Sequence, residues 1–143
     1  NRKASEAMMH VGVNACVDIT GFGLLGHLRL IAEGSVVRAR VSVSEVPVIE
    51  GVAELLDMGI APGGTHRNLE SLDGVVDWHP DISDQTQILL ADAQTSGGLL
   101  IAVAPEKTEA LLTALNDVGV ETRAVVGEIL EPETGKAALE VVP

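Results

Sequence analysis

Apolar residues recur along the chain with two spacings, which predict helices mixed with strands. Spacings of three and four residues predict a helix from Gly23 to Glu33. Alternating apolar and polar residues predict a strand from Val36 to Val43, half exposed because Arg38 and Arg40 fall on its polar face. The continuous apolar run from Leu99 to Val103 is the best candidate for a central strand.

Caps, glycines and prolines bound the remaining elements. Helices are expected over Ser5 to Val11, Val52 to Met58, Ser83 to Ala91 (capped by Ser83 or Asp84) and Glu106 to Val118, with a short helical piece within Ala61 to Asn68. Asn14 to Ile19 is expected to be a strand and Leu72 to Pro80 irregular, while Thr122 to Ile129 and Lys136 to Val142 are expected to pair as a terminal hairpin. The predicted fold class is α+β, a layered mixed β-sheet packed with helices in one domain spanning residues 1–143.

Composition narrows the classes of function. The formal net charge is −12, which argues against a nucleic-acid partner and against an anionic membrane surface. No apolar stretch reaches the roughly twenty residues that span a bilayer. Cys16 is the only cysteine, so an internal disulfide is excluded. Because the chain starts at Asn1 without an initiator methionine, we expect a domain of a longer protein.

The most informative segment is Asn14 to His27, where an apolar run ends in Asp18 and Thr20 and three glycines follow. An aspartate at a strand end, just before a glycine turn, can direct its carboxylate outward, where a divalent cation binds. Glycines such as Gly21 let phosphate oxygens approach the backbone. A plain strand-turn-helix corner with an Asp cap remains an equal alternative.

The same glycines also match the dinucleotide fingerprint G-x-G-x-x-G. Three observations count against a Rossmann-type site. Asp18 and Thr20 put a negative charge where a pyrophosphate would approach, and the next strand is half exposed. The rest of the chain also lacks further βαβ repeats.

Two more polar glycine turns interrupt the apolar chain. The first combines backbone amides with a hydroxyl and a guanidinium that suit an anion; its residues are Gly63, Gly64, Thr65, Arg67 and Asn68. The second precedes a strand, so it is no P-loop; its residues are Thr95, Ser96, Gly97 and Gly98. We expect both turns on the same side of the domain as Asp18, where they would line a phosphate site together with Thr20 and Gly21. The alternative is that they turn corners on different faces.

The remaining reactive side chains form no recognisable site. The four histidines lack metal-ligand spacing, and with one cysteine a zinc site is not expected. His27 is expected to be a partly exposed helix residue and Cys16 a small core residue. No catalytic base or nucleophile pair is visible, so the chain offers only part of a phosphate and metal site.

These motifs resemble those of the selenide, water dikinase (selenophosphate synthetase) family, in its C-terminal half. The matching segments are Ala15 to His27, Pro62 to Thr65 with Arg67 and Asn68, and Asp92 to Ile101, in the family's order and spacing. Ala93 stands where family members often have proline. Shorter parts of the pattern recur in the wider aminoimidazole ribonucleotide synthetase superfamily, whose C-terminal domain gives the expected fold.

The resemblance implies an ATP-dependent phosphotransferase that makes selenophosphate, AMP and phosphate from selenide, ATP and water, for selenocysteine and selenium-modified tRNA. It implies Mg²⁺ as cofactor, with Asp18 as one ligand, a cytoplasmic location and a homodimer. The nucleotide segment and the reactive residue of the family belong to an N-terminal half that is absent here, so no catalytic residue is expected in this chain and the chain alone is expected to be inactive. A domain of another superfamily enzyme and a non-catalytic interaction domain remain alternatives.

Overall fold

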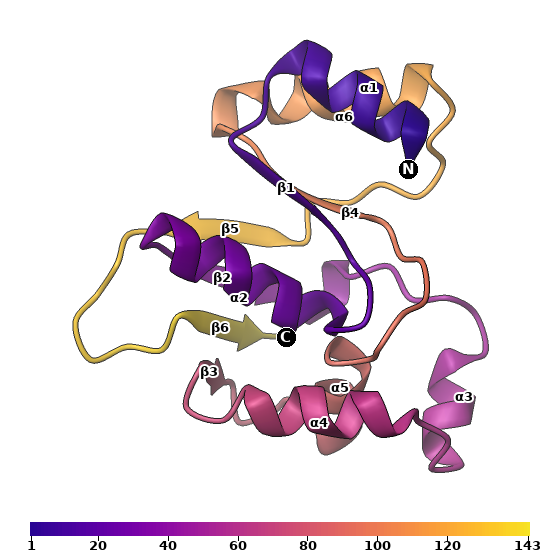
Figure 1. Cartoon of the computed structure of the whole chain (residues 1–143), viewed down its shortest axis with the longest axis vertical. Helices are drawn as coiled ribbons and strands as arrows, with labels where there is room; N and C mark the ends of the chain where they lie inside the picture. Colours follow the sequence, from indigo (N-terminus) through magenta and orange to yellow (C-terminus); the bar gives the residue numbers. More distant parts are fainter.

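The larger of two sheets has four short strands in the order β3-β6-β2-β5. The central strands β2 (Arg38–Ser42) and β6 (Leu139–Val142) run parallel to each other. β3 (Val76–Trp78) is parallel to β6, whereas β5 (Gly127–Leu130) is antiparallel to β2. The computed structural model describes all residues from 1 to 143 (Figure 1).

The alternation along β2 gives the large sheet one apolar and one charged face. Ala39 and Val41 are buried, and Arg38 and Arg40 alternate with them along β2, so their side chains lie on the opposite face. The predicted alternation is therefore confirmed, but β2 is not half exposed as expected: Arg38 is buried, no residue of the strand is exposed, and β2 pairs in parallel with β6.

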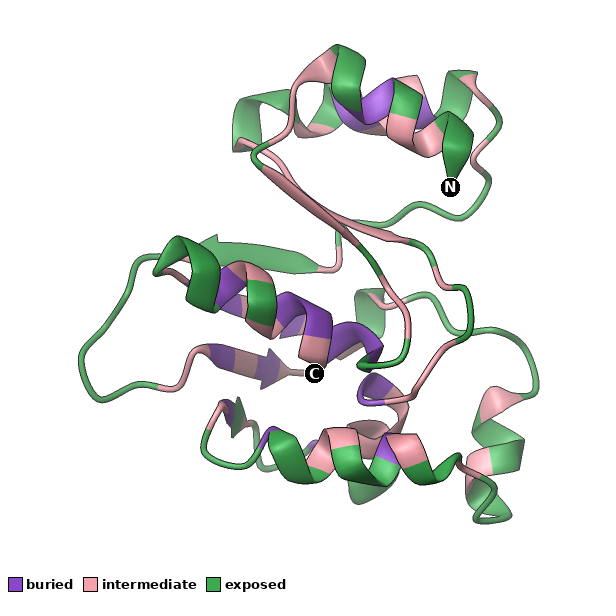
Figure 2. Ribbon diagram, in the orientation of Figure 1, coloured by how far each residue is buried: buried purple, intermediate pink, exposed green.

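Helices cover the apolar face of this sheet. α2 (Gly23–Ser35) lies against it, and α4 (Gly63–Ser71) and α5 (Asp84–Leu90) pack beside α2. The main core joins these elements and consists of Leu24, Leu25, Leu28, Ala32, Ala39, Val41, Leu72, Val76, Ile82, Leu90, Ala91, Leu139 and Val141 (Figure 2). Ser83 caps α5 by accepting a hydrogen bond from the Thr86 amide, as predicted.

Two helices packed against a two-stranded antiparallel ribbon form a second, smaller layer. β1 (Ala15–Asp18) pairs antiparallel with β4 (Leu99–Ala102), and α1 (Arg2–Val11) packs against α6 (Thr108–Asp117) beside this ribbon (Figure 1). Ala7, Met8, Leu111 and Leu115 form its core. The short elements η1 (Val43–Glu45), α3 (Val52–Asp57) and η2 (Pro105–Lys107) complete the chain. None of the helices combines the length and the apolar character that a membrane-spanning helix requires.

The α+β class is confirmed, but three predictions about strands are wrong. The run from Leu99 to Val103 is not central: β4 pairs with β1 alone, and its apolar residues contact the two cores from opposite faces. The last two strands form no hairpin, because β2 lies between β5 and β6. The segment from Leu72 to Pro80, expected to be irregular, contains β3.

Candidate functional site

Asp18 ends β1 and is exposed. It lines an open cleft of about 500 Å³ between the ribbon and the first turns of α1. The other lining residues are Asn1, Arg2, Ser5, Met8, Cys16, Val17 and Leu99. A carboxylate in this position is accessible from solvent, and its role as a cation ligand stays a prediction.

The Thr20 to Gly23 turn follows Asp18 and opens α2. The Gly23 amide donates to the Thr20 carbonyl over 3.0 Å, and Gly23 has a φ of 69°. A Cβ atom on Gly23 would lie 2.6–2.9 Å from backbone atoms of Ala91 and Asp92. Only glycine therefore permits both the left-handed backbone and this close contact with the end of α5.

The second turn is fastened to the first by Asn68. Its side-chain amide donates to the Gly21 carbonyl over 2.8 Å and to the Ala91 carbonyl over 3.0 Å. Arg67 is exposed, and its guanidinium lies beside Gly63 and Gly64. The guanidinium forms no ion pair, which leaves it available to an anion.

Thr65 differs from the other residues proposed to line a phosphate site. Its side chain is fully buried, and its hydroxyl donates to Asp92 Oδ1 over 2.7 Å. The Thr65 hydroxyl oxygen in turn accepts a hydrogen bond from the Ala93 amide over 3.1 Å. The hydroxyl has no exposed surface for a ligand, so Thr65 instead anchors α4 to the segment after α5. The sequence did not identify Asp92 as its partner, because the two residues lie far apart in the chain.

The third turn pairs directly with the residue after Asp18. The Gly97 amide donates to the Ile19 carbonyl, and the Ile19 amide donates to the Gly98 carbonyl, each over 2.9 Å. The Gln94 amide donates to the Thr20 carbonyl over 3.1 Å. Thr95 and Ser96 are exposed. Hydrogen bonds therefore connect the second and third turns to the residues that follow Asp18, while the roles of all three turns in binding stay predictions.

Two neighbouring side chains change the chemistry of this region. His27 is only 6% exposed, so its prediction as a partly exposed helix residue is wrong. Its position three residues after Leu24 and four before Ile31, on the apolar side of α2, was a signal for burial. Cys16 is half-buried. Burial raises the pKa of its thiol, and the negative charge of the nearby Asp18 carboxylate raises it further by a smaller amount. The thiol is therefore held in its neutral form, which agrees with a packing role.

The predicted metal site has only Asp18 as a candidate ligand from this chain. No group of three or more His, Cys, Asp or Glu side chains is arranged to hold a metal ion. Mg²⁺, however, keeps several waters and takes one or two carboxylates together with phosphate oxygens. One exposed aspartate fits a share of such a shell, and not a whole one.

The chain matches one protein family and is similar in sequence to several selenide, water dikinases. The family described as AIR synthase related protein, C-terminal domain, matches residues 1–140. A selenide, water dikinase of Pelobacter propionicus is 43% identical over 140 residues, which cover 98% of this chain and 40% of the relative. A selenide, water dikinase of Caldanaerobacter subterraneus is 46% identical over 133 residues, which cover 93% of this chain and 38% of the relative. A selenide, water dikinase of Escherichia coli O139:H28 is 42% identical over 130 residues, which cover 91% of this chain and 36% of the relative. The chain thus spans about two fifths of the length of these relatives.

Proposed function

Because the chain belongs to the family of AIR synthase related protein C-terminal domains, we propose that it is the C-terminal domain of a selenide, water dikinase. In this proposal the complete enzyme converts selenide, ATP and water into selenophosphate, AMP and phosphate. The identities of 42–46% to the three enzymes of that name support the assignment. The nucleotide-binding part of the enzyme lies outside these 143 residues.

The observation that carries the proposal is that the exposed Asp18 is followed directly by Ile19, Thr20 and Gly21, whose carbonyl groups accept hydrogen bonds from the second and third polar turns. Asp18 supplies one ligand to Mg²⁺, and the other protein ligands come from the N-terminal part. When bound, Mg²⁺ supplies positive charge that neutralises the phosphate oxygens of ATP. The chain therefore forms one wall of a site that two domains share.

Three groups of this chain then have distinct tasks at that wall. Arg67 and the amides around Gly63 attract and orient phosphate oxygens. Thr95 and Ser96 offer free hydroxyls at the third turn. Asn68 has both of its amide hydrogens bound to carbonyl groups, so it holds the turns together and does not itself donate to phosphate.

Complementation tests the assignment. This chain, joined to the N-terminal half of a related selenide, water dikinase, should restore selenophosphate synthesis in a strain that lacks it. The isolated chain should form no AMP from ATP and selenide. AMP formation by a preparation free of full-length enzyme, or failure of a well-expressed and folded fusion, would contradict the proposal.

Asp18→Asn tests the metal role within the same fusion. The neutral amide has nearly the same volume but lacks the charge, so we expect magnesium-dependent turnover to fall at least about tenfold with an unchanged melting temperature. Asp117→Asn, at the exposed end of α6, is the matched control and should leave turnover unchanged. Equal magnesium dependence in Asp18→Asn and the unaltered fusion would identify Asp18 as a structural cap only.

A further inference from the structure

His27 accepts a hydrogen bond from the turn that follows Asp18. The Thr20 amide donates to His27 Nε2 over 3.0 Å, and the Thr20 hydroxyl oxygen lies 3.2 Å from the same nitrogen. His27 is 94% buried, so water does not compete for this nitrogen. The imidazole therefore links the first turn of α2 to the backbone of the turn beside the candidate site.

These contacts determine which ring nitrogen carries the proton. An amide always donates, so Nε2 must accept and carries no hydrogen. In a neutral imidazole the hydrogen then sits on Nδ1. His27 Nδ1 is the single buried side-chain polar atom of the structure without a hydrogen-bond partner. A hydrogen on Nδ1 is therefore unpaired, and this costs free energy that the hydrogen bond at Nε2 has to offset.

The same reasoning orients the Thr20 hydroxyl. With Nε2 unprotonated, a hydroxyl oxygen 3.2 Å away would bring two lone pairs face to face unless the O–H points at the ring. The hydroxyl hydrogen is thus directed toward His27. The oxygen then has its lone pairs available as acceptors, and the Thr20 residue is only partly buried.

Phe22 and Gly26 hold the ring in this position. The Phe22 ring lies across the imidazole with centroids 5.4 Å apart, although 59% of Phe22 is exposed. A Cβ atom on Gly26 would lie 2.8 Å from Phe22 Cβ, so glycine at this position lets the aromatic side chain fold back over α2. An exposed phenylalanine thereby covers a buried polar ring.

We propose that His27, as its Nδ1-protonated tautomer, is a positioning residue that presents the Thr20 hydroxyl to the site as a hydrogen-bond acceptor. Such an oxygen pairs with an N–H or with a water bound to a cation, and it repels a bare phosphate oxygen. The part of this inference that concerns the cation rests on the proposed function, whereas the tautomer and the turn do not. Thr20 then belongs to the cation side of the site and not to its phosphate side.

Long-range ¹H–¹⁵N spectra of the labelled 143-residue chain at neutral pH test the tautomer. We expect Nε2 of His27 to show the resonance of an unprotonated nitrogen and Nδ1 that of a protonated one. A protonated Nε2, in either the other neutral tautomer or the imidazolium, overturns the proposal. This result is independent of whether the complete enzyme makes selenophosphate.

Variants test the positioning role through hydrogen exchange of the Thr20 amide. The oxygen of His27→Gln can accept where Nε2 does, so protection should stay within about threefold of the unaltered chain, whereas His27→Leu should lose roughly tenfold or more. His10→Gln, at the exposed end of α1, is the control and should change nothing. Equal protection in the leucine and glutamine variants overturns the role. If His27→Leu does not fold, a tenfold loss in folded His27→Gln overturns it as well.

Thr20→Val separates the hydroxyl from the amide. The variant keeps the amide donor, so its amide should remain protected, and the His27 Nε2 resonance should shift because one donor is lost. In the fusion enzyme, the magnesium concentration for half-maximal turnover should rise several-fold while the KM for ATP stays constant. A rise in the KM for ATP alone would return Thr20 to the phosphate side and contradict the inference.

Discussion

At the scale of single residues, the region around Asp18 combines an exposed carboxylate with a shielded thiol. Cys16 and Asp18 lie two positions apart on β1 and line the same cleft. The carboxylate is open to solvent, while burial and that same negative charge disfavour the thiolate. Burial and the charge of Asp18, and not the residue type alone, therefore favour a packing role for Cys16.

We expect Cys16 to react slowly with iodoacetamide at neutral pH. Because its pKa is raised in the folded chain, the alkylation rate should begin to rise at a higher pH than in the urea-unfolded chain. The associated stabilisation is present below the unfolded-state pKa, and the free energy of unfolding falls as pH rises through the folded-state pKa. Rate profiles of both states against pH measure this difference.

Asp18→Asn provides the matching variant for this profile. It removes the smaller of the two causes, so the Cys16 pKa should move part of the way toward its ordinary value. Coincident profiles for the variant and the unaltered chain would show that the Asp18 carboxylate does not act on the thiol.

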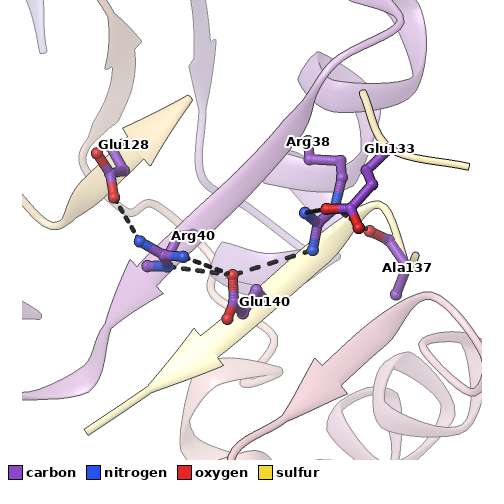
Figure 3. Close-up of polar contacts among 6 residues, drawn as sticks. All are labelled: Arg38, Arg40, Glu128, Glu133, Ala137 and Glu140. Carbon is purple, nitrogen blue, oxygen red and sulfur yellow. Dashed lines mark hydrogen bonds and ion pairs between the residues drawn. The ribbon is translucent and has the colours of Figure 1, made fainter. Parts of the chain in front are cut away.

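At the scale of elements, the charged face of the large sheet forms across three strands. Arg40 lies opposite Glu128 of β5 and Glu140 of β6 in the strand register, and it contacts both carboxylates at 2.7–3.1 Å (Figure 3). The hydrogen bond to Glu140 and the two charges raise the pKa of Arg40. These pairs link strands that lie far apart in the chain and mark β2 as the centre of the sheet.

Arg38 should matter more for stability than Arg40. The Arg38 side chain is 11% exposed, and its Nε donates to the Ala137 carbonyl over 2.8 Å, whereas that of Arg40 is 38% exposed. We expect Arg38→Met to lower the free energy of unfolding by about 1–2 kcal/mol. Arg40→Met should lower it less, and a larger share of that loss should disappear in high salt, because the Arg40 ion pairs are more exposed than those of Arg38 with Glu133 and Glu140. Urea denaturation at two salt concentrations compares them; a larger effect of Arg40→Met would reverse this ranking.

The C-terminus of α2 contains a strained residue. The Val36 amide donates to Glu33 and the Val37 amide to Ala32, which is a Schellman motif, and Val36 has a φ of 53° where glycine is usual. Because a β-branched residue is disfavoured in this conformation, we expect Val36→Gly to raise the free energy of unfolding by about 0.5–1 kcal/mol, despite the greater unfolded-state entropy of glycine. Val36→Ala retains a Cβ atom and serves as the control. Thermal denaturation measures both, and a loss of stability in Val36→Gly would show that the strain is absent.

At the scale of the whole molecule, two cores of unequal size are joined by one ribbon. The main core contains 13 buried residues and the α1–α6 core four. β4 contributes to both, since Leu100 packs on the main core and Leu99 and Ile101 on the smaller one, while Cys16 of β1 packs on the smaller core alone. The ribbon therefore connects Asp18 to both layers.

We expect the α1–α6 layer to open more readily than the large sheet. Fewer buried apolar side chains hold it, so the amides of α1 and α6 should exchange with a lower opening free energy than those of β2 and β6. Native-state hydrogen exchange with increasing urea measures both sets. If all amides exchange only through global unfolding, the two layers form one cooperative unit.

The local features of this protein could be predicted from residues that are neighbours in the chain. The Asp18 strand end, the polar turns, the alternation along β2 and the Ser83 cap depend on residues a few positions apart, so pattern and propensity suffice. The same holds for the α+β class and for the helices close to their observed bounds.

The arrangement of these helices, strands and turns depends on contacts between distant residues and became visible only in the tertiary structure. A hairpin and two strands flanking a third have the same local pattern, so the insertion of β2 between β5 and β6 was not visible. The run Leu99 to Val103 is apolar because the ribbon contacts two cores, which resembles a central strand in sequence. The burial of His27 against Thr20 and of Thr65 against Asp92 likewise depends on contacts across the fold, because polar side chains are buried only where the folded chain supplies a partner.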